Sequence, residues 1–466
     1  MDGENDISQH TPGQRICPGS RKSESLAWHI LAAVLEVPQA ARERIVVTGL
    51  GAVSAWGWSA SSLWSGLRSN RTGIGTSRRF DTRGHRTRVV GEVPEAGAGI
   101  HAGLDRWQHY SRADRFAVAA AVEACRQAGW ITSPETSPPG LGAGAGVFFG
   151  GSTGGMAEGE EYFRALLDDG PGSARLSLLA PHQLNCPGDE VARLLGVRGP
   201  VRSFTSACAS GALAIGAALD ALRRGEVQVA IAGGADSLCQ LTYAGFNSLR
   251  AVDSRPCRPF RRERAGLSLG EGAGILILEP LERALSRGAR PLAEVLGAGG
   301  SCDAHHMTAP HPRGVGAARA IQRALQNAAI DANAIDFINA HGTATPRNDV
   351  AEWQAIRKVF GARAASIPVT STKGSVGHLL GSSGAIEAVA TVQCLLAGEV
   401  HPTPGDGSLD EACGVDLVHS RPRPLPTAAP GEAAVAVSTS FGFGGANAAL
   451  VLGGIGAPRD SGSSEG

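Results

Sequence analysis

Apolar segments typical of buried strands alternate with helix-like segments along most of this chain, and this alternation restricts its fold more than any other feature. Residues 44–57, 145–155 and 227–236 each combine β-branched or small apolar residues with a glycine-rich turn, and residues 111–130 fit a helix between the first two. Strands that are apolar on both faces need cover on both sides. The pattern therefore predicts an α/β fold in which the sheets lie between helices.

A second cycle of strands and helices begins at residue 291 and repeats the order of the first. In each cycle a loop of small residues opens a Gly/Ala-rich helix, and the two helices end in the similar sequences ALRRGEV and CLLAGEV. A chain of 466 residues is also long for a single core. We therefore expect two similar halves, residues 44–290 and 291–454, related by internal duplication.

The two ends of the chain differ from this pattern. Residues 1–43 begin with a polar, turn-rich stretch that precedes a short apolar segment, unlike a secretory signal peptide. We expect a flexible extension there and a flexible tail at residues 455–466. No stretch is expected to reach the roughly 18 apolar residues of a membrane span.

Composition restricts the partners and the compartment. Lys plus Arg and Asp plus Glu each number 43, so the formal net charge is zero and predicts no general attraction to nucleic acid or to a membrane surface. The nine cysteines are odd in number and scattered, without a paired CxxC motif. We expect reduced thiols in the cytoplasm, with neither a disulfide framework nor a metal site.

The segment SFTSACASGALAIGAALDALRRG places Cys208 between small residues at the start of a predicted helix. Free cysteines are often buried and inert, so a structural thiol is one interpretation. The other is a nucleophile, because backbone N–H groups and the helix dipole at a helix start favour the thiolate and lower its pKa. The same N–H groups could bind an oxyanion.

Two histidines lie in similar loops, His341 in NAHGTATP and His378 in STKGSVGHLLGSSGA. A histidine in a turn often serves only as a hydrogen-bonding group. Two neutral imidazoles that donate from Nε2 could instead stabilise an enolate oxygen or transfer a proton. Lys373 lies in the second loop and could influence both rings, and Glu387 on the following helix could pair with it.

The segment STSFGFGGAN allows two interpretations of Phe441 and Phe443. It could be a tight hairpin with two packed rings. Alternatively, the glycines around Phe443 could form a hinge that lets the ring gate a pocket.

Taken together, these segments resemble the elongating β-ketoacyl-acyl-carrier-protein synthases, from about residue 44 to residue 452. The likeness rests on several motifs in one order, among them VTGLGAVSAWG, GPVRSFTSACASG, VAIAGGAD, SRPCRPF, GEGAG, HMTAP, NAHGTATP and SFGFGGAN. The resemblance implies a thiolase-like fold, with duplicated βαβαβαβ halves forming a layered α-β-α-β-α sandwich. It also implies an acyltransferase that performs a decarboxylative Claisen condensation of an acyl-enzyme thioester with malonyl-acyl-carrier protein.

The resemblance also implies a role for each residue that matches a motif. Cys208 would be the nucleophile, His341 and His378 would support decarboxylation, and Lys373 would order the site. The backbone N–H groups of Cys208 and Phe443 would form the oxyanion hole. Phe443, with Phe441 beside it, would gate the site. Thr308, Thr343 and Thr345 match positions that contact the pantetheine arm and the malonyl unit.

The implied partners follow from the same family. An acyl-carrier protein would bring its own phosphopantetheine, so no further cofactor is expected. By position, Arg112, Arg175 and Arg250 are the candidates for docking that carrier. A homodimer is expected, or a heterodimer with a ketosynthase-like chain.

The motifs also bear on two other functions. A thiolase would need two cysteines and one histidine, whereas the motifs here offer one cysteine and two histidines. A non-catalytic chain-length partner would lack the nucleophile, so Cys208 argues against it. The family pattern is broken at Gly374, Val376, Ala265 and in GTATPRND, and Thr153 stands where the acyl pocket often has an apolar residue. These departures leave fatty-acid elongation and a polyketide or polyene pathway both open.

Overall fold

The described residues of the computed structural model are 43–95, 110–131, 141–425 and 433–456. The predicted extension at residues 1–43 and the predicted tail at residues 455–466 therefore lie almost entirely outside them. The strands and helices below belong to the unit that begins at Arg44.

Most strands join one sheet of 11 strands, which contains parallel and antiparallel pairs. The long strands are buried along nearly their whole length, as the continuous apolar segments predict. In order across the sheet, the strands are β12 (Asp416–Leu417), β10 (Pro368–Thr370), β9 (Phe337–Asn339), β14 (Val435–Phe441), β15 (Ala446–Gly453), β8 (Ala293–Cys302), β1 (Ile45–Val53), β7 (Gly272–Pro280), β6 (Val229–Asp236), β4 (Ala145–Gly150) and β5 (Val201–Phe204).

The strand order is the same when it is followed outward in either direction from the central pair β1 and β8. On one side come β7, β6, β4 and β5, and on the other β15, β14, β9 and β10. The strand directions agree as well, because the first two pairings on each side are antiparallel and the next two are parallel. The predicted duplication of the fold is confirmed.

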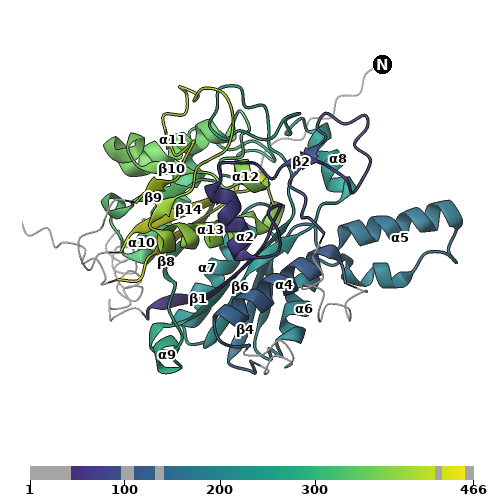
Figure 1. Cartoon of the computed structure of the whole chain (residues 1–466), viewed down its shortest axis with the longest axis horizontal. Helices are drawn as coiled ribbons and strands as arrows, with labels where there is room; N and C mark the ends of the chain where they lie inside the picture. Colours follow the sequence, from purple (N-terminus) through teal and green to yellow (C-terminus); the bar gives the residue numbers. More distant parts are fainter. Residues whose placement is uncertain (1–42, 96–109, 132–140, 426–432, 457–466) are drawn as a thin grey trace, which may run out of the picture. The chain divides into compact units, whose positions relative to one another are not determined.

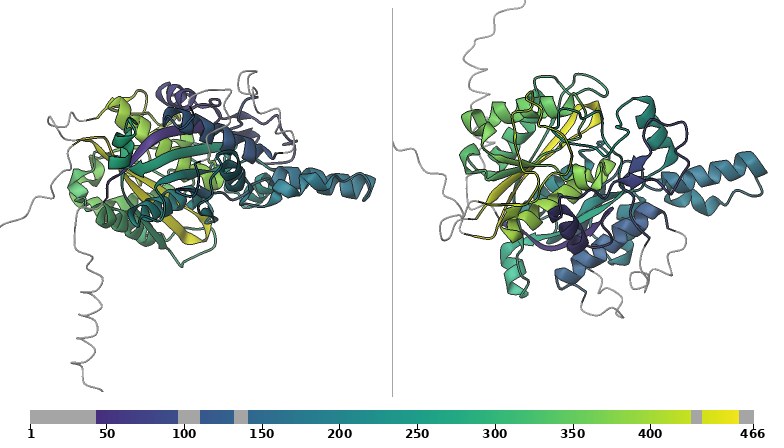
Figure 2. Two further views of the ribbon diagram at one scale, coloured as in Figure 1. Left: turned by 90° about the horizontal axis from the view of Figure 1, so that it is seen from below. Right: turned by 45° about the horizontal axis from the view of Figure 1, so that its top comes forward.

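Helices cover both faces of each half and complete a layered sandwich (Figures 1 and 2). Helices α7 (Ser210–Arg223) and α13 (Ser383–Ala397) contact each other and strands of both halves, so they form the middle layer. Helices α4 (Arg112–Gln127) and α6 (Cys186–Leu194) cover the first half, and α10 (Val315–Ala328) and α11 (Asn348–Phe360) cover the second. The middle helices are the two that end in the similar sequences noted above.

Glycine allows α7 and α13 to approach each other closely. A Cβ atom added to Gly211 would lie 2.8 Å from the backbone nitrogen of Ala385, and one added to Gly384 would lie 2.8 Å from that of Ala212. Both distances are too short for a side chain, so each helix presents a glycine to the other at the crossing. The loops that precede the two helices are thereby brought together.

Residues Leu380–Ala397, which include α13, are long and apolar enough to cross a membrane by length and composition. The expectation that no segment would reach this length is therefore wrong. The segment is 83% buried within the protein and belongs to the middle layer of the sandwich. Its hydrophobicity is explained by contact with strands on both sides.

The remaining elements lie around this sandwich. Helix α5 (Met156–Asp169) extends away from the layers in every view (Figures 1 and 2). The other elements are α2 (Ala60–Arg68), α8 (Gln240–Ser248), α9 (Leu281–Ser286), α12 (Lys373–Val376) and the short strands β2 (Gly75–Thr76), β3 (Val89–Val90), β11 (Glu399–Val400) and β13 (Arg423–Pro424).

Candidate active site

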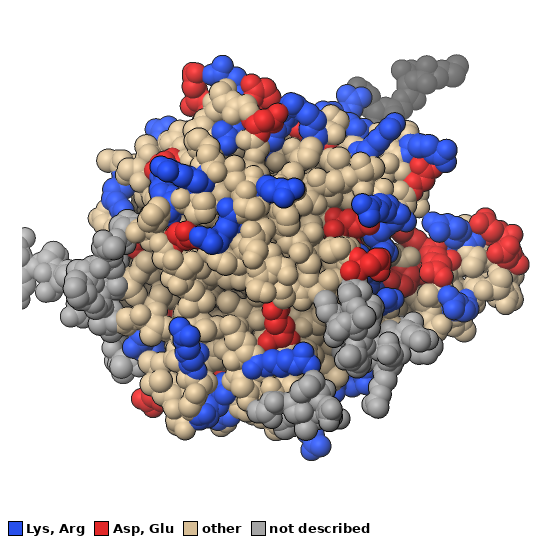
Figure 3. All heavy atoms as spheres, in the orientation of Figure 1, with Lys and Arg blue, Asp and Glu red and all other residues tan. Residues whose placement is uncertain are grey.

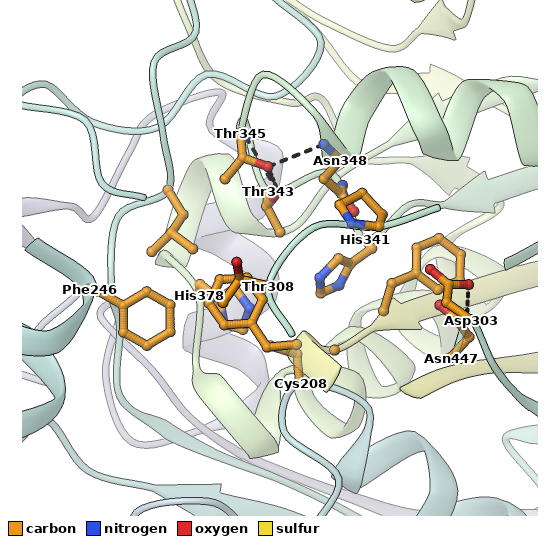
Figure 4. Close-up of a pocket in the computed structure, with 15 residues that line it drawn as sticks. Cys208, Phe246, Asp303, Thr308, His341, Thr343, Thr345, Asn348, His378 and Asn447 are labelled. Atoms are coloured by element: carbon orange, nitrogen blue, oxygen red, sulfur yellow. Dashed lines mark hydrogen bonds between the residues drawn. The ribbon is translucent and has the colours of Figure 1, made fainter. Parts of the chain in front are cut away.

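The loops that enter α7 and α13 carry Cys208 and His378, and they meet the loops that follow β9 and β14. Together they line a pocket of about 490 Å³, a volume that includes the open space at its mouth. Figure 4 shows Cys208, His341 and His378 around this space. The lining residues are Cys208, Phe246, Leu267, Asp303, Thr308, Pro310, His341, Thr343, Thr345, Asn348, His378, Phe441, Gly442, Phe443 and Asn447.

Cys208 lies in a sharp turn between β5 and α7, directly before the helix N-cap Ala209. Ala207 has a φ of 48°, a left-handed conformation that is unfavourable for a residue other than glycine. Ser210 fixes the turn, because its hydroxyl accepts the N–H of Ser206 at 2.8 Å and donates to the carbonyl of Ala207 at 2.6 Å. The turn holds Cys208, which is 7% exposed, at the pocket.

The acidity of Cys208 differs from the sequence prediction. Burial raises the pKa of its thiol to about 11, although the charge of Lys373 and the N–H groups of Phe443 and Cys208 act in the opposite direction. The predicted lowering of the pKa at a helix start is therefore wrong for the unliganded protein, since desolvation outweighs the groups that favour the thiolate. At rest Cys208 is therefore a thiol, and its proton would have to leave for the sulfur to act as a nucleophile.

Both histidines at the pocket are neutral, because burial and the charge of Lys373 hold the pKa of each ring well below its usual value. Lys373 donates from Nζ to His341 Nδ1 at 3.0 Å, and the N–H of Leu380 donates to His378 Nδ1 at 2.9 Å. An accepting Nδ1 carries no proton, so in each ring the proton lies on Nε2. Cys208 Sγ and one ring nitrogen of each histidine lie within 4.8 Å of one another.

Lys373 and Glu387 form a buried ion pair, which confirms the predicted pairing. Lys373 begins α12 and Glu387 lies on α13, so the pair links the loop of His378 to the middle layer. A buried ammonium without a partner would be strongly unfavourable. With Glu387 balancing its charge, Lys373 can direct an N–H at His341 and set its tautomer.

Cys208, His341 and His378 form the one group of three potential metal ligands found among the described residues. The Lys373 ammonium lies 3.0 Å from His341 Nδ1, so a metal cation would meet its repulsion. The Nε2 proton of each histidine would also have to leave before that nitrogen could bind a metal. The expectation that no metal is used stays a prediction.

Two buried carboxylates that the sequence reading missed shape the loop of His341. Glu352 on α11 accepts the N–H groups of His341 at 2.9 Å and Gly342 at 2.8 Å, and the hydroxyl of Thr439 at 2.8 Å. Asp349 lies three residues earlier on the same helix and is fully buried. The two acids stand three and six residues after the TATP segment, at helical spacing, and this pattern could have revealed them.

A third buried carboxylate, Asp236 at the end of β6, was also missed. It accepts the N–H of Ser152 at 2.9 Å, the N–H of Thr153 at 2.7 Å and the N–H of Ser382 at 3.2 Å. The hydroxyl of Thr153 also lies 2.8 Å from Asp236 Oδ1. Asp236 therefore ties the glycine loop after β4 to the loop before α13.

Phe443 lies in the tight connection of the antiparallel pair β14 and β15, so the segment is a hairpin. Its ring stacks on Phe246 of α8 with ring centroids 5.5 Å apart. Gly444 has a φ of 82° and donates its N–H to the carbonyl of Met307 at 2.7 Å. This geometry covers one side of the pocket with an aromatic ring, and motion of the ring stays a prediction.

The structure brings the other predicted pocket residues to the same place. Phe441 packs against His341 with ring centroids 5.7 Å apart. The hydroxyl oxygens of Thr343 and Thr345 lie 2.9 Å apart (Figure 4), and Thr308 faces the pocket from the loop after β8. Among the polar lining residues, the sequence reading missed Asp303, Asn348 and Asn447.

The three arginines predicted to dock a carrier protein differ in their surroundings. Arg112 is buried and paired with Glu271 at 2.6 Å, so it cannot meet a partner on the surface and this assignment is wrong. Arg175 is exposed and pairs with Glu161 at 3.2 Å. Arg250 is exposed and has no ion-pair partner among the described residues.

Comparison with known proteins gives two family matches in succession along the chain. The Beta-ketoacyl synthase, N-terminal domain, matches residues 42–284, and the Beta-ketoacyl synthase, C-terminal domain, matches residues 292–405. The chain is 40% identical over 394 residues to 3-oxoacyl-[acyl-carrier-protein] synthase 2 of Synechocystis sp., covering 82% of this chain and 93% of that protein.

Solved structures with the same fold agree with these matches. The ishigamide ketosynthase/chain length factor is similar with a TM-score of 0.81 and 35% identity, covering 89% of this chain and 100% of that one. A type II polyketide acyl-carrier protein in complex with its ketosynthase bound to the hexaketide is similar with a TM-score of 0.76 and 28% identity, covering 89% and 100%. With the pocket geometry, these findings show that the chain belongs to the β-ketoacyl synthase family.

Proposed function

We propose that this chain lengthens an acyl group bound to Cys208 by condensing it with a malonyl unit carried on an acyl-carrier protein. As a β-ketoacyl-acyl-carrier-protein synthase it is an acyltransferase. The observation that carries the assignment of residues is the cluster of Cys208 Sγ with a ring nitrogen of each histidine, all within 4.8 Å. A non-catalytic chain-length partner would not need this cluster.

In the first step, Cys208 Sγ attacks the thioester carbonyl of the acyl-carrier protein. A C–S bond to Cys208 forms, the bond to the carrier sulfur breaks, and the carrier thiol leaves with the proton that Cys208 gives up. The intermediate has a negatively charged oxygen that the N–H groups of Cys208 and Phe443 can bind. Both N–H groups already act on the sulfur in the unliganded site.

In the second step, the malonyl carboxylate leaves as carbon dioxide and its bonding electron pair forms an enolate. The enolate oxygen accepts hydrogen bonds from Nε2–H of His341 and His378, which are donors because Nδ1 is occupied in both rings. The enolate carbon then attacks the acyl carbonyl. A C–C bond forms, and the Cys208 sulfur leaves and regains a proton from water.

Intact-mass measurement after incubation with acyl-carrier proteins tests the first step. The wild-type protein should gain the mass of one acyl group, and Cys208→Ala should gain none. Acylation of Cys208→Ala at the wild-type rate would overturn the assignment of the nucleophile.

Release of labelled carbon dioxide tests the second step. His341→Ala and His378→Ala should each release it on the order of 100- to 1000-fold more slowly, because each removes one aimed donor. Their acylation at Cys208 should change much less. Near-normal release from both variants would rule out the proposed role.

We infer that the partner subunit is a second ketosynthase-like chain. Strand β5 lies at an edge of the sheet, and Val201 on it is 39% exposed. Helix α5 exposes Phe163 by 51% and Leu167 by 81%, and nearby Leu176 is 72% exposed. A free edge and exposed apolar side chains are features of a surface that binds another protein. Light scattering should give the mass of a dimer if this chain pairs with itself, and of a monomer if it needs a related chain.

The relatives include a 3-oxoacyl-acyl-carrier-protein synthase and ketosynthases named with a chain length factor or a type II polyketide carrier. A panel of carriers bearing short saturated, long saturated and polyunsaturated acyl groups would separate fatty-acid from polyketide or polyene use.

We place the protein in the cytoplasm, an assignment that the eight free cysteines among the described residues support.

A further inference from the structure

One buried carboxylate binds two residues with left-handed backbone. Asp349 lies in the first turn of α11 and is fully buried. Its Oδ2 accepts the N–H of Phe260 at 2.8 Å, and its Oδ1 accepts the N–H of Ala344 at 3.1 Å. The φ angles of Phe260 and Ala344 are 61° and 63°. Residues other than glycine persist in this conformation only where their surroundings fix it.

Both left-handed residues belong to, or contact, the loop of His341. Ala344 lies between Thr343 and Thr345, whose hydroxyls line the pocket. The ring of Phe260 packs under Gly342, since a Cβ atom added to Gly342 would lie 3.0 Å from Phe260 Cε2. A change at Asp349 would therefore reach the pocket through two separate contacts.

Arg264 is a charged group that contacts both Asp349 and this loop, and it contributes differently. Its Nε lies 3.5 Å from Asp349 Oδ2 and balances the buried negative charge. Its contacts with the carbonyls of Thr345 and Pro346 are long, at 3.4 Å and 3.3 Å. Arg264 therefore binds the carbonyl groups of the second threonine and of the proline after it, whereas Asp349 binds the N–H of Ala344 between the two threonines.

We propose that Asp349 is a positioning residue, which sets Thr343 and Thr345 for the carrier-bound arm by holding Ala344 and Phe260 in the left-handed conformation. The proposal rests on the proposed function and on the role that the family resemblance implies for these threonines, which is contact with the pantetheine arm and the malonyl unit. Asp349 itself does not line the pocket.

The variant Asp349→Asn keeps the size of the side chain but replaces one acceptor oxygen with an amide donor. One of the two N–H groups then loses its partner, and the loop can leave the left-handed conformation. We expect the KM for malonyl-acyl-carrier protein to rise roughly tenfold, with a smaller change in kcat. Alkylation of Cys208 by iodoacetamide should keep its wild-type rate.

A second substitution tests the cause. Ala344→Gly removes the penalty for the left-handed conformation. The double variant Asp349→Asn with Ala344→Gly should therefore have a KM close to that of the wild type. Ala329→Gly is the matched control, because Ala329 also has a left-handed φ, 52°, but lies at the C-cap of α10. It should not restore the KM of Asp349→Asn. If Asp349→Asn alone is insoluble, recovery of soluble protein by Ala344→Gly and not by Ala329→Gly is the expected result.

Three results would overturn the proposal: an unchanged KM in Asp349→Asn, equal rescue by both glycine variants, or loss of Cys208 alkylation together with the rise in KM. Failure of the proposed function would appear differently. In that case Thr343→Ala and Thr345→Ala, with Asp349 intact, would leave the KM for the carrier-bound substrate unchanged.

Discussion

At the residue scale, Cys208 is subject to two opposing influences. Its place before α7 and the nearby charge of Lys373 favour the thiolate, whereas burial disfavours it and raises the pKa to about 11. The sulfur is therefore protonated near neutral pH and becomes reactive only as its proton is removed. A substrate carbonyl bound at the N–H groups of Cys208 and Phe443 would be attacked by the sulfur as the thiol proton leaves.

The alkylation rate of Cys208 should therefore depend steeply on pH. Because iodoacetamide reacts with the thiolate, its rate should rise roughly tenfold per pH unit between about pH 7 and pH 10. Mass spectrometry of the Cys208 peptide measures this rate, with the exposed Cys302 in the same digest as a control for the reagent. A plateau already reached near pH 8 would show that the helix start outweighs burial after all.

The sequence was sufficient to predict which side chains meet at the pocket but not their protonation. Cys208, His341 and His378 each lie in a loop whose residue types indicate the chemistry. The tautomers depend on Lys373, which is 32 positions from His341, and on the backbone of Leu380. The contact of Lys373 with His341 forms only when their two loops meet in the folded second half, and the contact of Leu380 with His378 depends on the exact turn of the backbone, so the residue types alone do not reveal either.

At the element scale, the hairpin of β14 and β15 holds Phe443 over the pocket in a conformation that needs glycine. Gly444 has a φ of 82°, and a Cβ atom added to it would meet no atom within 4 Å. An alanine there would strain the backbone without any steric clash. A substitution at Gly444 therefore tests the backbone conformation of the loop without changing how the loop packs.

Gly444→Ala should slow condensation roughly five- to thirtyfold, because a left-handed alanine costs about 1–2 kcal/mol and favours other loop conformations. Its melting temperature should stay close to that of the wild type. Gly170→Ala is the control, since Gly170 has a φ of 83° and equal space but lies at the C-cap of α5. Unchanged turnover in Gly444→Ala would mean that the hairpin is not a gate.

The order of strands and helices was predictable from sequence because the apolar segments and glycine turns repeat. The close crossing of α7 and α13 was not predictable, because the sequence does not show which element packs against a glycine in a helix. Gly374 is similar: it breaks the family pattern, but a Cβ atom there would lie 2.9 Å from the carbonyl of Pro404. What looked like a departure is a requirement of this chain's own packing.

At the scale of the whole molecule, charge is spread rather than gathered. On the face in Figure 3, positive and negative side chains are interspersed, in keeping with the zero net charge. If a carrier protein is attracted by charge, that attraction must therefore be local. Three exposed arginines lie within five residues of pocket-lining residues and have no ion-pair partner among the described residues. They are Arg250, Arg313 and Arg347.

Arg250→Glu should raise the KM for acyl-carrier protein, and the difference from the wild type should shrink as salt rises, because about 0.1 M salt screens charges beyond about 10 Å. Labelling of Cys208 by a small uncharged electrophile should not change. Arg224→Glu makes the same change of charge at the far end of α7 and should leave the KM unaltered. A parallel loss of labelling in Arg250→Glu would show that Arg250 supports the site itself.

Buried neutral histidines should make the fold sensitive to acid. Burial lowers the pKa of His401 to about 4, whereas in the unfolded chain it is about 6.5. The unfolded state therefore binds a proton first, and stability is lost as pH falls from about 6.5 toward 4, by up to about 3 kcal/mol. His401→Gln should reduce this slope in denaturant unfolding between pH 7 and pH 5. The exposed His305→Gln should keep the wild-type slope, and an unchanged slope in His401→Gln would contradict the assignment.

The crossing of α7 and α13 shows which residue of the second half corresponds to Cys208, the proposed nucleophile of the first half. Aligning Gly211 with Gly384 aligns the segments CASGA and GSSGA, so the counterpart of Cys208 is Gly381. A Cβ atom on Gly381 would lie 2.6 Å from the backbone carbon of Gly151 and 2.8 Å from Asp236 Oδ2. In the second half, close packing of the loop against Gly151 and Asp236 leaves no room for a side chain at this position. Under the proposed function, the first half would therefore hold the growing chain on Cys208, and the second half would activate the extender unit with its two histidines.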